Sequence, residues 1–73
     1  MTEYAIGKVV KGWKLLDRQS RGRLELWERT DKGNYSVELF RHNTKDEHWI
    51  LNIKRKRKEA AVELFEFILK ILR

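Results

Sequence analysis

The sequence contains no cysteine and no proline among its 73 residues. The absence of cysteine excludes disulfides and thiolate metal sites, and it is consistent with a reducing compartment. No low-complexity linker and no internal repeat divides the chain, so we expect a single domain over residues 1–73. A chain of this length buries only a small core, and oligomerisation is the form of support that its composition leaves open.

Long hydrophobic runs are also missing, because charged residues interrupt the longest apolar stretches every three or four positions. None of these stretches is long enough to cross a bilayer, so we expect no membrane partner. Residues 1–7 lack the basic start and the apolar run of a signal peptide. The chain is therefore expected to be cytoplasmic or nucleoid-associated.

Signals of catalysis are scarce. We find no phosphate-binding loop and no Ser/His/Asp order, and the two histidines, His42 and His48, are too few for a convincing zinc site. Asp46, Glu47 and His48 are consecutive, so they do not converge in the way that a catalytic triad does. We expect no enzymatic activity, no metal, no cofactor and no small-molecule substrate.

Basic residues are abundant, with 17 Lys and Arg against 11 Asp and Glu, for a net charge of +6. Five consecutive cations, Lys54, Arg55, Lys56, Arg57 and Lys58, form a basic block just before an apolar C-terminal segment. Such a block repels itself and crowds the positive end of a following helix, which prefers acidic residues. The ordinary interpretation is a solvated charged run, whereas a polyanionic partner would give the block a function.

The chain is predicted to fold as an α+β domain, a four-stranded antiparallel meander followed by one C-terminal helix (ββββα). Turn-forming residues separate the strands, most clearly at 31–34, where Gly and Asn tolerate positive φ. The expected strands are one long bent strand over 4–18 with bulges expected at Gly7 or Gly12, then 23–30, 35–42 and 48–55, and the helix covers 59–73.

Alternation along these strands separates two faces of the sheet. The aliphatic face, which we expect the helix to cover, contains Leu15, Leu24, Leu26, Val37, Leu39, Leu51 and Ile53, with Trp13, Tyr35 and Trp49 also on this face. The opposite face combines Leu16, Trp27, Phe40 and Ile50 with the cations Lys14, Arg18, Arg23, Arg29 and Lys54. A bulge near Gly12 would move Trp13 to this second face.

The helical segment is apolar around most of its circumference. Its charged residues, Glu59, Glu63, Glu66, Lys70 and Arg73, recur every three or four positions and make one narrow stripe. A single sheet covers an apolar stripe only a little over ~100° wide, so a second surface is needed. We expect that surface to be the same helix of a second copy, with an interface of Val62, Phe65, Leu69 and Leu72.

Aromatic residues interleaved with cations are typical of sheets that bind single strands, in which bases stack on rings and cations follow the phosphates. The alternative is that Trp27 and Phe40 cover a small second core. The residues predicted to bind nucleic acid are Lys8, Lys14, Arg18, Arg23, Trp27, Arg29, Phe40 and the basic block Lys54, Arg55, Lys56, Arg57 and Lys58.

Several short motifs resemble one known family. Residues 4–8 resemble its aromatic-x-Ile-Gly-Lys opening, residues 11–14 its Lys-Gly-Trp-Arg motif, and residues 35–40 its Tyr-Asp-Ile-Arg-Thr-Trp strand. The family is that of the single-stranded-DNA-binding domain of transcriptional coactivator positive cofactor four, its small bacterial relatives and, more distantly, the plant Whirly proteins. The resemblance implies a homodimer that binds single strands through its two sheets, with Lys8, Lys14 and Phe40 as matching contacts.

The chain departs from this family at three points. Glu38 replaces an Arg, His48 and Trp49 replace a Lys-Gly pair, and the basic block replaces the helix cap. We therefore expect a homodimeric protein that binds single-stranded nucleic acid, DNA in preference to RNA, largely independently of sequence, in a process such as transcription, replication or repair. Two alternatives stay open: a protein-interaction module that docks its helix and basic sheet on another protein, and a regulator that inserts a β-ribbon into duplex DNA.

Overall fold

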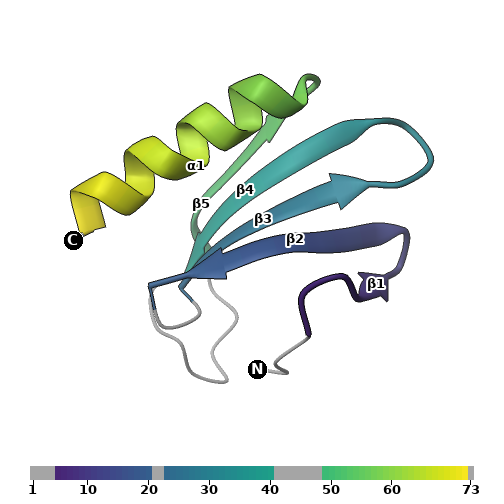
Figure 1. Cartoon of the computed structure of the whole chain (residues 1–73), viewed down its shortest axis with the longest axis horizontal. Coiled ribbons are helices and arrows are strands. Elements are labelled where there is room, and N and C mark those ends of the chain that lie inside the picture. The colour runs from purple at the N-terminus through teal and green to yellow at the C-terminus, as the bar shows by residue number, and fades with distance from the viewer. Residues whose placement is uncertain (1–4, 21–22, 41–48, 73) are drawn as a thin grey trace.

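Five antiparallel strands and one helix make up the computed structural model, which describes residues 5–20, 23–40 and 49–72, with the backbone alone for Trp49. The strands follow one another across the sheet in sequence order, so each pairs with its neighbours in the chain (Figure 1). The elements are β1 (Val9–Val10), β2 (Trp13–Gln19), β3 (Leu24–Arg29), β4 (Asn34–Phe40), β5 (Trp49–Arg55) and α1 (Lys58–Leu72). The expected α+β class, meander and C-terminal helix are confirmed.

The expected number of four strands is wrong, because a tight hairpin interrupts the first one. Val10 pairs with Trp13, and the two residues between them, Lys11 and Gly12, have φ values of 51° and 85°. Two successive positive φ angles are typical of a type I′ turn, whose twist matches that of antiparallel strands. Gly12 adopts this conformation without the steric cost of a Cβ atom. The chain therefore reverses direction and makes the short strand β1.

A second irregularity lies within β2, where the register shifts between Leu15 and Asp17. Leu15 is opposite Trp27 and Asp17 is opposite Leu26, so Leu16 is the extra residue of a bulge. Because directly opposed residues share a face, Leu15 lies on the same side of the sheet as Trp27. A face assignment by simple alternation ignores this bulge, so it puts the residues of β2 that precede Leu16 on the wrong faces of the sheet.

This bulge corrects four predicted positions. Trp13 is opposite Arg29, so Trp13 and Leu15 lie on the face that α1 leaves uncovered rather than on the aliphatic face. Lys14 is opposite Glu28 on the helix side of the sheet, and Leu16 packs against the helix-side core instead of facing away from it. The bulge occurs at Leu16, not near Gly12, and no sequence signal marks it.

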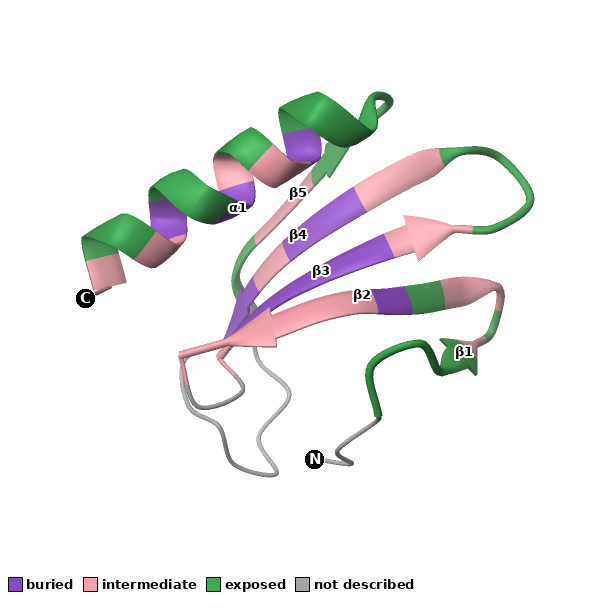
Figure 2. Ribbon diagram, viewed as in Figure 1, coloured by how far each residue is buried: buried purple, intermediate pink, exposed green. Residues whose placement is uncertain are grey.

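The core lies between α1 and one face of the sheet. It contains the buried side chains Leu24, Leu26, Val37 and Leu39 from β3 and β4, and Ala61, Phe65 and Ile68 from α1. Figure 2 shows these buried segments facing one another. The helix begins at Lys58, the last residue of the basic block, and places its buried residues at spacings of four and three, so they form one stripe. The aliphatic face predicted for β3 and β4 is therefore confirmed.

The helix positions predicted to form a dimer interface lie on the side of α1 that faces the sheet. Phe65 is only 3% exposed, and Val62, Leu69 and Leu72 pack against the same core. The outward apolar residues are instead Phe67 and Ile71, which are 61% and 64% exposed. The four predicted interface residues therefore pack toward the core of one copy, which contradicts their assignment to a dimer interface. No helix in the described ranges is long and apolar enough to cross a membrane.

Three connections of the chain meet at one end of the sheet. They are the β1–β2 turn, the β3–β4 loop and the β5–α1 junction (Figure 1). The first two are tied together, because the backbone N–H and the hydroxyl of Thr30 donate hydrogen bonds to the Gly12 carbonyl over 3.0 and 3.1 Å. The Cα register runs from Tyr35 to Arg55 at this end, which brings the basic block beside the hairpin loops.

Replacing Phe65 with Ala is expected to lower the free energy of unfolding by about 3–5 kcal/mol, because it removes a buried ring and leaves a cavity. Urea denaturation followed by circular dichroism measures the change. Glu63→Ala, an exposed position half a turn away, should stay within about 0.5 kcal/mol of the original protein. Phe65→Leu provides a milder variant if Phe65→Ala does not fold. Equal effects at positions 63 and 65 would contradict the observed orientation of α1.

Candidate nucleic-acid interface

The sheet has an outer face, defined here as the face opposite α1. Cross-strand register and alternation along the strands assign these described side chains to it: Val10, Trp13, Leu15, Arg18, Glu25, Trp27, Arg29, Asn34, Ser36, Glu38, Phe40, Asn52 and Lys54. These residues stand in rows across the strands. The row nearest the three connections contains Val10, Trp13, Arg29 and Asn34, the next contains Leu15, Trp27, Ser36 and Lys54, and a later one contains Arg18, Glu25, Glu38 and Asn52.

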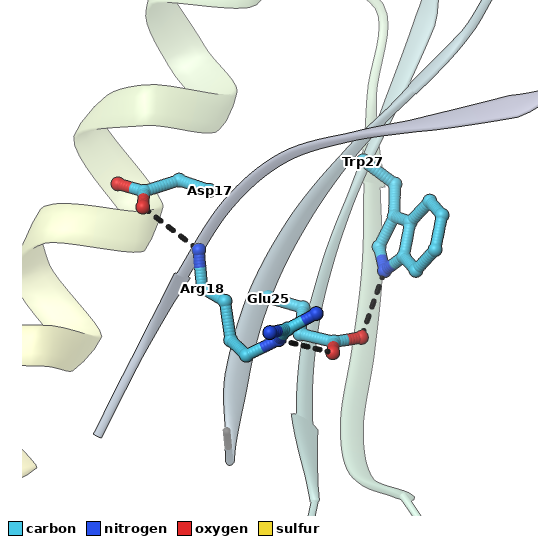
Figure 3. A network of polar contacts seen from close by, with 4 residues as sticks. All are labelled: Asp17, Arg18, Glu25 and Trp27. Carbon is cyan, nitrogen blue, oxygen red and sulfur yellow. Dashed lines mark hydrogen bonds and ion pairs between the residues drawn. The ribbon is translucent and has the colours of Figure 1, made fainter. Parts of the chain in front are cut away.

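Trp27 and Phe40, the two aromatics predicted to stack bases, are buried at 8% and 6% exposure. The Trp27 indole N–H donates a hydrogen bond of 3.0 Å to Oε1 of Glu25 (Figure 3), and its cross-strand neighbour Leu15 is completely buried. The expectation that these two rings are presented at the surface is wrong. Both rings are buried on the outer face, which agrees with the alternative of buried rings that their sequence context left open.

Trp13 is the aromatic residue on which two cations of the outer face, Arg29 and Lys54, converge. The guanidinium carbon of Arg29 lies 5.5 Å from the centroid of the Trp13 ring, and Nζ of Lys54 lies 5.7 Å from it. Trp13 is on β2 and Lys54 is on β5, so this geometry requires the two side chains to reach toward each other across β3 and β4. Both distances are within the range of cation–π interactions. Trp13 is half-buried, and part of its surface remains accessible.

Two arginines predicted to bind phosphate are engaged within the fold. Nε of Arg18 lies 3.4 Å from Oε2 of Glu25, with which it forms an ion pair (Figure 3). Nε of Arg23 donates a hydrogen bond of 3.1 Å to the Phe40 carbonyl, which ties the start of β3 to the end of β4. These contacts give both side chains a structural function, so they are weaker candidates for phosphate binding than the exposed cations.

The centre of the outer face carries negative charge. Glu25 is directly opposite Glu38 on the neighbouring strand, and Glu25 is buried. Burial raises the pKa of the Glu25 carboxyl above its ordinary value of 4.5, while the hydrogen bond from Trp27 and the charge and hydrogen bond of Arg18 act in the opposite direction. Because like charges face each other here, the centre of the outer face is a poor site for a phosphate.

The end of the sheet that holds the three connections is strongly basic, and we call it the basic end. It carries nine cationic side chains against the three acidic residues Glu28, Asp31 and Glu59. The cations are Lys11, Lys14, Arg29, Lys32 and the basic block Lys54, Arg55, Lys56, Arg57 and Lys58, all exposed except the half-buried Arg29. Two ion pairs neutralise part of this charge, Arg29 with Asp31 at 2.9 Å and Arg57 with Glu59 at 3.5 Å.

Sequence reasoning missed Lys11 and Lys32 as members of this surface, because each lies in a turn and belongs to neither face of a strand. The available signal was topological, since alternate connections of a meander lie at the same end of the sheet. Lys8 is exposed before β1 and pairs through its backbone with Leu15, nearer the middle of the sheet. Lys14 is exposed on the helix side of the basic end.

Within the described ranges, no group of three or more His, Asp or Glu residues is arranged to hold a metal ion. His42 and His48, and the consecutive residues Asp46 and Glu47, lie outside these ranges.

The raised pKa of Glu25 predicts a pH dependence of stability. The folded state holds the Glu25 proton to a higher pH than the unfolded state does, so the free energy of unfolding falls as pH rises above about 4.5, the unfolded value. Glu25→Gln removes this titration, and the original protein should therefore lose stability relative to the variant as pH rises through that window. Urea denaturation at a series of pH values measures the difference. Glu66→Gln, on the exposed side of α1, is the control, and an identical profile for the original protein and Glu25→Gln would contradict the assignment.

No protein-family model, curated protein or solved structure matches this chain. The similarity of its short motifs to positive cofactor four therefore stays a resemblance, and the argument for function depends on the surface of the protein itself.

Proposed function

We propose that this chain is a nucleic-acid-binding protein that holds single strands, most simply single-stranded DNA, without sequence preference and without catalysing a reaction. The observation that carries the proposal is the convergence of Arg29 and Lys54 on the Trp13 ring at the basic end. An aromatic ring between cations is the arrangement that single-strand-binding surfaces use, because every base has a π-face and every nucleotide has a phosphate.

In the proposed binding mode, the Trp13 ring contacts a base and the cations contact phosphates. A base stacks on the accessible part of Trp13, which contributes about 1–3 kcal/mol per base in comparable sites. Arg29 and Lys54 then bind the flanking phosphates, and the backbone continues across the exposed lysines of the hairpin turns and the basic block. The bound nucleic acid passes along the basic end rather than over the acidic centre of the outer face, where Glu25 and Glu38 would repel its phosphates.

Replacing Trp13 with Ala is expected to weaken binding to oligo(dT) by about 5- to 150-fold, the equivalent of removing one base stack. Fluorescence anisotropy of labelled oligo(dT), at low salt, measures the dissociation constant. Trp27→Phe is the matched control, because that ring is buried, and it should change the affinity little. A Trp13→Ala protein that is folded and binds as tightly as the original would remove the basis of the proposal.

Competition with RNA and with duplex DNA identifies the preferred nucleic acid, and a preference for duplex of one sequence would favour a β-ribbon regulator.

Neutralising the basic block by Arg55→Gln, Lys56→Gln, Arg57→Gln and Lys58→Gln should weaken binding without abolishing it, since Trp13, Arg29 and Lys54 remain. Because counterions are released when cations neutralise phosphates, the slope of log K against log salt should become shallower by about 0.7 for each phosphate that the variant no longer neutralises. Titrations at several salt concentrations give this slope. Binding of the original protein that is indifferent to salt would argue against a phosphate-binding surface.

We further propose that two copies associate through the outward side of α1. Ala60, Leu64, Phe67 and Ile71 recur at helical spacing and form an apolar stripe beside the charged one, and Leu64 alone of these packs partly against the core. The charged stripe is acidic in its first half, at Glu59, Glu63 and Glu66, and basic at Lys70. An antiparallel pair of helices would therefore place Glu63 of each copy near Lys70 of the other, whereas a parallel pair would place like charges together.

Replacing Phe67 and Ile71 with Ser should convert a dimer to a monomer, because both exposed apolar side chains leave the interface. Analytical ultracentrifugation over a range of concentrations measures the change, with Glu66→Gln as the control. A monomeric original protein would contradict the homodimer, and a monomer that captures other proteins through this stripe would favour the protein-interaction module.

A further inference from the structure

The contacts around Lys54 form a connected polar network within the described residues. Lys54 is directly opposite Ser36 on β4, and Asn52 lies two residues earlier on the same face of β5. The Ser36 hydroxyl lies 3.0 Å from Oδ1 of Asn52 and 3.2 Å from Oε2 of Glu38, and Nζ of Lys54 lies 3.5 Å from the same Asn52 oxygen. Asn52 therefore stands between a buried hydroxyl and the ammonium that approaches Trp13.

Ser36 is the buried member of this polar network. Ser36 is 1% exposed in the middle of β4, so its hydroxyl has no ready access to solvent and needs partners within the protein. A hydroxyl has one hydrogen to donate, and an amide carries an acceptor oxygen and a donor nitrogen. When Ser36 donates to Asn52, the amide oxygen is held toward Ser36 and Lys54, and this orientation is the one that accepts a hydrogen bond from the ammonium.

The lysine side chain gains most from such a contact. A lysine ammonium is a point charge on a flexible four-carbon stem, and an unrestrained one would sample many positions above an exposed edge strand. Asn52 limits that freedom at the strand, and the Trp13 ring limits it 5.7 Å from the ammonium. Both restraints direct the charge of Lys54 over the outer face, toward the surface proposed to bind a phosphate.

We infer that Asn52, oriented by Ser36, is a positioning residue that holds the Lys54 ammonium at Trp13 for a bound phosphate. Asn52 itself touches no ligand in this role and acts through Lys54. The inference rests on the proposed function, since it assigns a cause to the placement of one of the two cations at that site. It also gives Lys54 a role different from that of the rest of the basic block, because Lys54 is the member whose charge lies over the Trp13 ring.

A double-mutant cycle with oligo(dT) as the probe tests the inference. Asn52→Ala is expected to weaken binding about two- to fivefold, the range of an exposed charged interaction, when Lys54 is present. In a Lys54→Met background, the same Asn52→Ala change should have no further effect, because there is no ammonium left to position. A general structural role of Asn52 would weaken binding by the same factor in both backgrounds, and that result would overturn the inference.

Gln19→Ala supplies a matched control, because Gln19 is a half-buried amide on the helix side of β2, with the core residue Leu24 as its cross-strand partner. It should leave binding within about twofold of the original protein in both backgrounds. Ser36→Ala should reproduce part of the Asn52→Ala effect, and only when Lys54 is present. If the original protein fails to bind oligo(dT) at low salt, the proposed function is wrong and the inference falls with it. If it binds but the two substitutions act independently, only the positioning role is wrong.

Discussion

The packing of Phe65 and its neighbours against β3 and β4 is the constraint on which the rest of the structure depends. It decides which face of the sheet is covered, which side of α1 is left exposed, and where the chain must cross from β5 into the helix. In a domain of this size the buried apolar area is small, so most of the net stability comes from this one layer. Because the helix packs on one face of the sheet, the chain is free to place charged and aromatic residues on the other.

The outer face is organised by a second, smaller set of buried groups. Leu15, Trp27 and Phe40 are buried although no helix covers them, and Glu25 holds both the Trp27 indole and the Arg18 guanidinium. These contacts make the centre of the face structural. The accessible chemistry is consequently displaced to the basic end, where Trp13 meets cations from β3 and β5. The buried side chains at the centre of the outer face and the accessible cations at the basic end therefore belong to successive rows of the same sheet.

Sequence reasoning recovered the class of the fold and most of its elements, because alternation in β3 and β4, the 31–34 turn and the long apolar helix are strong local signals. It failed in β2, where a single unpaired residue at Leu16 reverses the faces of everything before it, and no residue type marks a bulge of this kind. The error moved Trp13 into the core and Lys14 onto the outer face. It also left Trp27 and Phe40 as the apparent stacking residues, since alternation assigns a face but does not report how deeply a ring is covered. Two further features could not be predicted from local patterns. The turn lysines lie beside the basic block only because of the order of the strands. An apolar arc around most of a helix does not reveal which part of the helix packs on the sheet.

The order of the strands has a consequence for how the chain reaches this structure. Every pairing in the sheet joins strands that are adjacent in the sequence, so each strand pairs with a neighbour in the chain without a crossover. Proteins with this property fold quickly, since little chain entropy is lost before contacts form. The chain also contains no proline, so no slow prolyl isomerisation delays it. Each hairpin can therefore form from neighbouring residues, whereas the docking of α1 requires β3 and β4 to be in register.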